Sequence, residues 1–389
     1  MKVLVTGATG YIGSAAADAL LKRGHRVLGL ARSDHASTTL RDRGIEPAIG
    51  DFGDPASLRA AVSAADVDAV VSAASLGASA GDSAATFARD RDAVRAIQSA
   101  LSRPDQALVF TSGSAVFGTF NDGETSDTVY DEDGLVPLPR STLAPASAAV
   151  PPIIATGFAD AMRARVETEQ AVLGHPRLRG IVIRPGLVYG HGGSYDIPAL
   201  IARARARGRA GHLGRGATTQ SYVHIDDLAE LYCLAVERAP SHTILHGIIA
   251  DITQCQLAQA VNQLLGLDER TENLTLTQML EMSAIERLGL AVARPLASRL
   301  HQTLNATFTP SPSVGFGISL SLNKRLSSEK TRCLLGWAPT RTDVLSDIAT
   351  GSYSNGVTGD HGETLYPQKP VGRTRWWPTT TNTSSVRVP

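Results

Sequence analysis

The chain has 389 residues, of which 37 are Lys or Arg and 37 are Asp or Glu, so its formal net charge is zero. This balance provides no overall field that would favour nucleic acid or an anionic membrane surface, and we expect neither as a partner. Hydrophobic residues make up 43% of the sequence, a share typical of a globular protein with a large core. The three cysteines are far apart in the sequence, so neither a disulfide framework nor a metal site is predicted.

Targeting segments are not indicated. Met1 runs directly into the apolar stretch KVLVTG, and no stretch approaches the roughly 18 apolar residues of a spanning helix. We therefore expect a cytoplasmic protein.

Short β-branched runs alternate with helical stretches over residues 1–190. Continuous apolar strands separated by amphipathic helices are typical of a parallel sheet that is buried on both faces. The fold class is therefore α/β, a Rossmann-type doubly wound parallel sheet. The expected strands read KVLVTG, RVLGLAR, PAIGDF, DAVVSAA, ALVFTSG and GIVIRPGLVYG.

The remaining chain is less regular. Residues 120–156 lose the pattern and are expected to form a lid or a disordered insertion. Helices are expected near 197–207, 226–238 and 257–265. We predict a dinucleotide-binding domain over residues 1–190 with a returning segment at about 220–250, a smaller C-terminal substrate-binding part over 191–353, and a flexible tail over 354–389.

The first strand is followed by VTGATGYIGS, which places Gly7, Gly10 and Gly13 in the spacing G-x-x-G-x-x-G. Glycine lets the chain turn sharply and brings backbone amides close to a pyrophosphate at the positive end of the next helix. The surrounding strand and helix strengthen a signal that would be weak alone. We therefore predict that a dinucleotide binds to the loop, listed in full as Gly7, Thr9, Gly10, Tyr11, Ile12 and Gly13.

The second strand ends in GLARSD, where a carboxylate would bind the ribose 2′-hydroxyl of NAD and an arginine would bind the 2′-phosphate of NADP. Ala31 occupies the acidic position, and Arg32 and Ser33 follow it. NADP(H) is therefore preferred and NAD(H) is possible. The nearby Asp34 keeps a solvated surface arginine open as the alternative.

These motifs resemble the extended short-chain dehydrogenase/reductase family, specifically its NAD-dependent epimerase/dehydratase group. TGATGYIG, GDFGDPASL, VFTSGSAVFG, RPGLVYGHGG and YVHIDDLAELY follow in the family's order and span about residues 1–353. The resemblance implies that Asp51 and Phe52 flank the adenine, that Ala73 lies below the cofactor and that Pro185 lies beside the nicotinamide. It also implies that His224 and Asp227 form a structural hinge, and that a homodimer is possible.

The catalytic positions depart from the family pattern. Family members carry Tyr-x-x-x-Lys ahead of a glutamate, and the helix here has neither residue. If Glu169 is that glutamate, Arg165 holds the lysine position and Ala161 the tyrosine position. Arginine keeps the positive charge and could bind the nicotinamide ribose, but its pKa above about 12 excludes an ordinary proton shuttle.

A different proton donor is therefore needed, because hydride transfer to a carbonyl leaves negative charge on oxygen. Gly113 replaces the family's serine or threonine, with Ser112 and Ser114 beside it. The hypothesis is that Ser114 or Tyr130 substitutes, and Arg165 completes the predicted catalytic set. Other available donors are Tyr189, His191 and Tyr195.

Family members that act on nucleotide sugars carry an arginine before the YVH strand, where this chain has Gln220. The basic run over residues 203–215 is interpreted as a solvated helix face, since arginines at intervals of two spread around the cylinder. A small or apolar alcohol or ketone is the favoured substrate. The favoured function is thus an NADP-dependent oxidoreductase or an epimerase, and the alternative is an NADP(H)-binding redox sensor that has lost catalysis.

Overall fold

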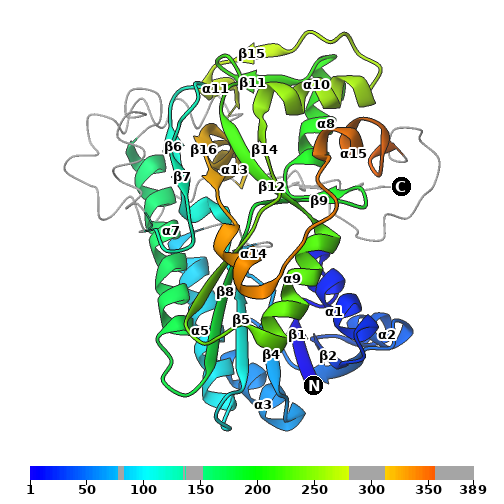
Figure 1. Ribbon diagram of the computed structural model, residues 1–389, viewed down its shortest axis with the longest axis vertical. Helices are drawn as coiled ribbons and strands as arrows, with labels where there is room; N and C mark the ends of the chain where they lie inside the picture. Colours follow the sequence, from blue (N-terminus) through cyan, green and yellow to red (C-terminus); the bar gives the residue numbers. More distant parts are fainter. Residues whose placement is uncertain (78–82, 135, 137–151, 280–311, 355–389) are drawn as a thin grey trace, which may run out of the picture.

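Seven parallel strands form the centre of the computed structural model, which describes residues 1–77, 83–134, 136, 152–279 and 312–354 (Figure 1). The strand order is β13-β8-β5-β4-β1-β2-β3, and every neighbouring pair is parallel. The order reverses between β1 and β4, which is where doubly wound sheets bind ligands. The strands are β1 Lys2–Thr6, β2 Arg26–Ala31, β3 Glu46–Ile49, β4 Ala69–Ser72, β5 Ala107–Thr111, β8 Arg179–Pro185 and β13 Thr243–Gly247.

Helices cover both faces of this sheet, as Figure 1 shows. The helices α1 (Tyr11–Lys22), α2 (Asp34–Asp42) and α9 (Ile225–Arg238) enclose one core. The helices α3 (Pro55–Ala65), α5 (Ala84–Ala100) and α7 (Pro152–Leu173) enclose the other. Local sequence sets the helix starts: Ser33, Asp54 and Ser83 each accept a backbone N–H as an N-cap. The Rossmann-type fold predicted from the sequence is confirmed.

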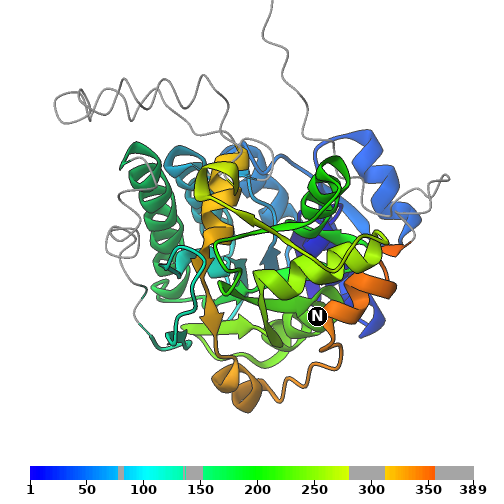
Figure 2. The same cartoon turned by 90° about the horizontal axis from the view of Figure 1, so that it is seen from above.

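A second, smaller part lies beyond the carboxyl ends of the strands (Figure 2). Its four-stranded sheet has the order β10-β9-β12-β14. The strands are β9 Leu187–Gly190, β10 Gly193–Ser194, β12 Thr219–His224 and β14 Ala250–Thr253. Around it lie α8 Ile197–Arg207, α10 Gln254–Leu264, α11 Leu276–Met279, α13 Pro312–Ser321, α15 Val344–Thr350 and the pair β11 Gly211–Leu213 with β15 Glu272–Leu274.

Short strands join segments about 200 residues apart. The strands β6 (Thr119–Phe120) and β7 (Val129–Tyr130) pair with β16 (Leu322–Asn323) and β17 (Arg325–Leu326). The described part of the predicted insertion, residues 120–134, therefore contains ordered strands and a 3₁₀ turn, η1 (Ser114–Val116), precedes it. Residues 137–151, the rest of that insertion before α7, lie outside the described residues.

The predicted boundaries differ from the structure in two places. The strand β9 lies within residues 1–190 and β12 at the start of the returning segment at about 220–250, both predicted for the first domain, but both strands belong to the second sheet. After α14 (Glu329–Leu335), the chain returns to the first domain, where Leu335 and Trp337 join the core of α1 and α9. The predicted tail lies outside the described residues from 355 onwards. Within the described ranges, no helix is long and apolar enough to cross a membrane.

Candidate active site

The predicted cofactor residues gather at one edge of the central sheet. Gly7, Arg32 and Ala73 directly follow β1, β2 and β4, and Pro185 ends β8. Since all these strands run in parallel, their carboxyl ends face the same crevice. The sheet thus brings together residues separated by up to 178 positions in the sequence.

The glycine loop has the geometry that its spacing predicts. Gly7 has a φ of 70°, and a Cβ there would lie 3.1 Å from Ala73 O. A Cβ on Gly13 would collide with Gly7 O. Gly10 is the N-cap of α1 and makes no side-chain capping bond, while Thr9 and Gly10 are exposed. The first N–H groups of α1, at Tyr11, Ile12 and Gly13, can therefore bind an anion.

A solvent-exposed arginine directly follows β2. Arg32 is exposed, and Ser33 caps α2 by accepting the N–H of Ala36 at 3.2 Å. Because the Ser33 oxygen only accepts in that bond, its proton remains available to a phosphate oxygen. This arrangement is compatible with a 2′-phosphate at Arg32 and Ser33.

Arg43, which was not predicted as a site residue from the sequence, holds the glycine loop in place through three hydrogen bonds. Its guanidinium donates to Ala8 O at 3.0 Å, to Ser14 O at 2.9 Å and to Asp18 at 2.7 Å. These bonds connect α2 to both sides of the glycine loop. A single arginine near a helix end carries no sequence signal for such a role.

Two of the implied adenine contacts are largely engaged elsewhere. Asp51 accepts the N–H of Gly53 at 2.8 Å, and Phe52 is only 8% exposed within the core of α3 and α5. Only backbone or a ring edge of Phe52 can therefore face a cofactor. The implied roles of Asp51, Phe52, Ala73 and Pro185 stay predictions.

The helix α7 presents Arg165 to the end of β5. Its Nε donates to Ser112 Oγ at 3.2 Å, its Nη2 lies 3.5 Å from Thr111 O, and its guanidinium lies 4.9 Å from the centre of the Phe87 ring. Ala161, one turn earlier, is 1% exposed and packs in a cluster with Phe117. A positive charge thus lies at the sheet edge without a tyrosine beside it on α7.

The two predicted substitute donors both contact Phe117: Tyr130 through its ring, and Ser114 through its carbonyl oxygen, which accepts the N–H of Phe117 at 3.0 Å. Ser114 begins η1 and is 5% exposed. Tyr130 stacks on Phe117 with 4.8 Å between ring centres, and its hydroxyl is 2.8 Å from Thr119 Oγ1. Tyr130 belongs to the same cluster as Ala161. The hydroxyl in direct contact with Arg165 is, however, that of Ser112.

The other candidate donors have different surroundings. The hydroxyl of Tyr189 donates to Arg341 O at 2.7 Å, and burial raises its pKa far above the usual value. Tyr195 is 59% exposed. His191 has a φ of 53° and bonds to Asp226 at 2.9 Å. Because its hydroxyl is already bonded to Arg341 O, Tyr189 has a structural role.

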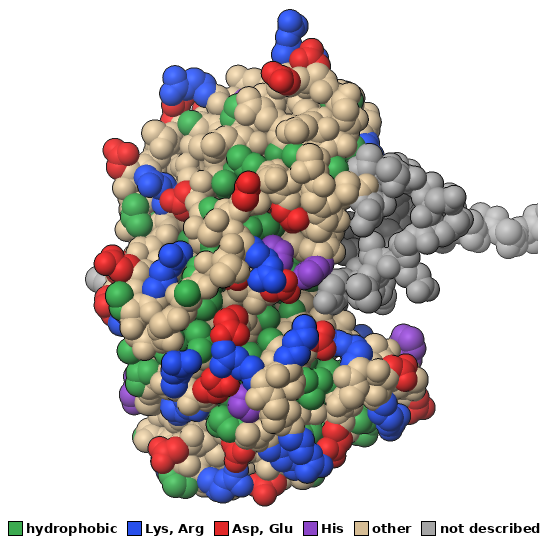
Figure 3. All heavy atoms as spheres, turned by 45° about the vertical axis from the view of Figure 1, so that its right-hand side comes forward, with side chains coloured by type: hydrophobic (Ala, Val, Ile, Leu, Met, Phe, Trp, Pro, Cys, Tyr) green, Lys and Arg blue, Asp and Glu red, His purple; other side chains and the backbone are tan. Residues whose placement is uncertain are grey.

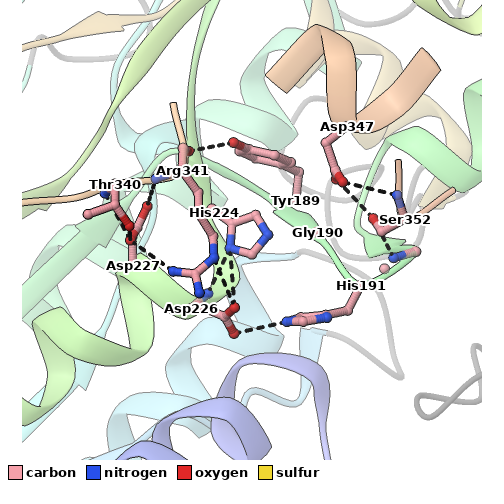
Figure 4. Close-up of polar contacts among 12 residues, drawn as sticks. Tyr189, Gly190, His191, His224, Asp226, Asp227, Thr340, Arg341, Asp347 and Ser352 are labelled. Carbon is pink, nitrogen blue, oxygen red and sulfur yellow. Dashed lines mark hydrogen bonds and ion pairs between the residues drawn. The ribbon is translucent and has the colours of Figure 1, made fainter. Parts of the chain in front are cut away.

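His224 and Asp227 connect the two parts of the molecule (Figure 4). His224 ends β12, and its Nδ1 accepts the N–H of Asp226 at 3.1 Å to cap α9. Asp227 is 4% exposed and accepts the N–H groups of Thr340 at 3.2 Å and Arg341 at 2.9 Å. Both residues therefore connect segments of the two parts, and their role as a hinge stays a prediction.

His191, His224 and Asp226 place potential metal-ligand atoms within 4.8 Å of one another. Burial lowers the pKa of His224. Burial alone would raise the pKa of Asp226, but the hydrogen bond from His191 and the nearby positive charges lower it overall. Arg341 Nε lies 3.2 Å from the same carboxylate and competes with any metal ion for it. We interpret this cluster as part of the hinge.

Most arginines of the basic run are exposed to solvent: Arg205, Arg207, Arg209 and Arg215. Arg203 and Arg207 are four residues apart, so they share one face of α8, and with Arg209 they line one cavity. Arg205 is not among the residues that line it. Elsewhere, the face shown in Figure 3 mixes acidic and basic side chains without a large patch of one sign.

Comparisons with known proteins identify the family of this chain. The model of the NAD dependent epimerase/dehydratase family matches residues 3–142 and 155–246. An uncharacterized protein of Schizosaccharomyces pombe is 26% identical over 91% of this chain and 100% of its own length. A 2-alkyl-3-oxoalkanoate reductase of Stenotrophomonas maltophilia is 29% identical over 68% of this chain and 75% of its own.

Solved structures share the fold at low identity. A human epimerase family protein with NADPH has a TM-score of 0.59 at 19% identity, covering 90% of this chain and 99% of its own. A dTDP-glucose 4,6-dehydratase from Bacillus anthracis in complex with NAD has a TM-score of 0.61 at 14% identity, covering 94% and 98%.

Proposed function

Because the chain belongs to the NAD-dependent epimerase/dehydratase family, we propose that it is an NADP(H)-dependent oxidoreductase that acts on a small-molecule alcohol or ketone. The proposal also covers an epimerase, in which the cofactor would be reduced and reoxidised within one reaction cycle. The observation that carries it is the position of Arg165, which contacts Ser112 and Thr111 at the sheet edge that also holds the glycine loop. A cation there can hold the nicotinamide ribose.

The preference for NADP(H) rests on the end of β2. Arg32 is exposed where a 2′-phosphate would lie, and Ala31 supplies no carboxylate for a free 2′-hydroxyl. The human epimerase family protein of similar fold was solved with NADPH, whereas the dehydratase was solved in complex with NAD. NAD(H) is the second choice.

The reaction requires a proton donor near the carbonyl oxygen. A bound reduced nicotinamide supplies the hydride to the carbonyl carbon, and one proton must reach the oxygen to give the alcohol. Tyr130 is our first candidate, because its ring packs in the cluster that contains Ala161. Ser114 is the second. Arg165 would bind the cofactor and orient Ser112.

The substrate class is supported by the relatives and by Gln220. The Stenotrophomonas relative is a reductase of 2-alkyl-3-oxoalkanoates by its name, and a Stigmatella aurantiaca relative, 27% identical over 62% of this chain, is a ketoreductase of a farnesylated quinoline oxide. Gln220 is 1% exposed and donates its amide to Leu320 O and Leu322 O. It therefore cannot grip a diphosphate as an arginine would.

A turnover assay tests the proposal. The purified protein should oxidise NADPH only when a carbonyl compound is added, across a panel of β-keto acids, aryl ketones and aldehydes. Tyr130→Phe combined with Ser114→Ala should lower turnover by roughly 10²-fold or more. Full turnover in that double variant would exclude both residues as donors.

A redox sensor is the second candidate, and the observation that favours it is Ala161. Its methyl group is buried among apolar side chains and can donate no proton. A sensor should bind NADPH and NADP with clearly different affinities and should oxidise NADPH with no member of the panel. That pair of results would replace the enzyme proposal.

A further inference from the structure

The turn between β9 and β10, formed by residues 190–193, is contacted by three segments that are far apart in the sequence. Tyr11 of the glycine loop, His224 at the end of β12 and Tyr353 near the end of the described chain all lie against it. The strand β9 that leads into the turn begins two residues after Pro185, the residue predicted beside the nicotinamide. The turn is therefore placed to influence the start of the smaller part of the molecule.

The side chain of Tyr11 joins the glycine loop to this turn. Its hydroxyl donates to Gly190 O at 2.8 Å and also lies 3.1 Å from Gly193 O. Its ring is so close that a Cβ on Gly193 would lie 2.6 Å from Tyr11 Cε2. Tyr11 is also the first residue of α1, where a free backbone N–H can bind a phosphate. Tyr11 can thus contact the cofactor through its backbone and the turn through its side chain.

A second tyrosine, which comes from outside the glycine loop, holds the same turn. The hydroxyl of Tyr353 accepts the N–H of Gly190 at 3.0 Å and donates to Gly193 O at 2.6 Å. Ser352 beside it accepts the N–H of Gly192 at 3.0 Å (Figure 4). Because both tyrosines bond to the same two residues of the turn, Tyr353 is a matched comparison for Tyr11.

The backbone of the turn depends on such contacts. Gly190, His191 and Gly192 have φ angles of 110°, 53° and 71°. A positive φ is sparsely populated by residues other than glycine, so the conformation of His191 is unfavourable on its own. The bond of 2.9 Å between His191 and Asp226 helps to hold it. Loss of a surrounding contact should therefore let the turn open more often.

We propose that Tyr11 is a positioning residue through which binding of the dinucleotide holds the turn of residues 190–193 in place. A phosphate bound at the start of α1 would fix the backbone of Tyr11, so its side chain would lose less freedom on bonding to the turn. The coupling is reciprocal, because the turn must then favour the dinucleotide by the same factor. The inference rests on the proposed function, since it requires a dinucleotide at the glycine loop.

Hydrogen–deuterium exchange of the full chain tests it, with mass spectrometry of peptides that cover residues 187–194. In the wild-type protein, saturating NADPH should slow exchange in the turn about fivefold, the effect of roughly one hydrogen bond. Tyr11→Phe keeps the ring but removes the hydroxyl, so it should abolish this slowing and weaken NADPH binding by a similar factor. Tyr353→Phe should speed exchange with and without NADPH but should retain the slowing by NADPH.

A second variant reaches the same contact from the turn, in case Tyr11→Phe does not fold. Gly193→Ala should displace the Tyr11 ring and should also abolish the slowing by NADPH. Slowing that persists in the variants of Tyr11 and Gly193, or that is lost equally in Tyr353→Phe, would overturn the inference. NADPH titration of the same samples separates the two proposals: NADPH binding without slower exchange in the turn overturns only this inference, whereas absence of NADPH binding overturns both.

Discussion

Arg165 is our proposed counterpart of the family's lysine, and its contacts define what this residue can do. It donates to Ser112 Oγ and lies over Phe87, so the charge is fixed at the end of β5. Because a guanidinium does not lose its proton near neutral pH, Arg165 can hold a cofactor but cannot relay a proton. The proposed reaction therefore requires a hydroxyl or a water nearby as its proton donor.

Arg165→Met should weaken NADPH binding by about tenfold or more, because hydrogen bonds from a charged group contribute about 1.5–3 kcal/mol. Arg163→Met provides the matched control, since Arg163 lies on the same helix and pairs at the surface with Asp160. Fluorescence titration measures both. Equal affinities in the two variants would show that Arg165 does not contact the cofactor.

The role of a single residue could be predicted from the sequence where only one residue type fits the required backbone conformation or chemistry. The glycine loop was predictable because only glycine fits Gly7 and Gly13. Arg43 and Ser112 were not assigned roles, because their partners are set by how α2 and α7 pack. The cavity lined by Arg203, Arg207 and Arg209 was not predicted, since Arg209 follows α8 and the direction of its side chain depends on the loop after the helix.

The pair α7 and β8 is held by a buried salt bridge. Arg184 and Glu169 are 3% and 2% exposed in their side chains, and two hydrogen bonds of 3.0 and 2.6 Å join them. Arg184 also lies 4.9 Å from the Phe117 ring centre. The bridge therefore positions α7, and with it Arg165, against the sheet.

Glu169→Gln should destabilise the protein by about 3–5 kcal/mol, because it leaves the buried Arg184 charge without its counter-charge. Glu167→Gln is the control on the same helix: its pair with Arg91 is partly exposed and should contribute less than about 1 kcal/mol. Urea denaturation gives both values. A loss for Glu169→Gln no greater than for the control would mean that α7 is held by apolar packing alone.

Among the elements, the long periodic ones were predictable and the short ones were not. The helices α8 and α9 lie within one residue of their expected starts and ends. The two-residue strands β6 and β7 escaped prediction because their partners are about 200 residues away and two residues show no periodicity. Because of this long-range pairing, part of the segment expected to form a lid forms short paired strands, one of which contains Tyr130.

At the scale of the whole molecule, a neutral buried histidine links stability to pH. His246 is fully buried where β13 meets β8, and its Nδ1 donates to Ser327 O at 2.9 Å. Burial, assisted by the charge of Arg184, lowers the pKa of His246 to about 4, against about 6.5 in an unfolded chain. The unfolded state therefore binds the extra proton between these values, and stability falls as the pH falls from about 6.5 towards 4.

Between about pH 7.5 and about pH 5, this residue should account for about 2 kcal/mol of lost stability. His246→Gln should remove that part of the pH dependence, whereas His35→Gln, at an exposed position, should retain it. Denaturant titrations at the two pH values measure the difference. A His246→Gln protein with an unchanged pH dependence would show that the histidine is not held neutral.

We propose that the glycine loop, Arg32 and Arg165 together form an NADP(H) site. The most direct measurement is a fluorescence titration of the purified protein with NADPH, NADP, NADH and NAD, repeated with Arg32→Asp and with Arg41→Asp as an exposed control on α2. We predict that NADPH binds most tightly and that only Arg32→Asp weakens it, by about tenfold or more. If none of the four dinucleotides binds in the micromolar to sub-millimolar range, the redox function is wrong.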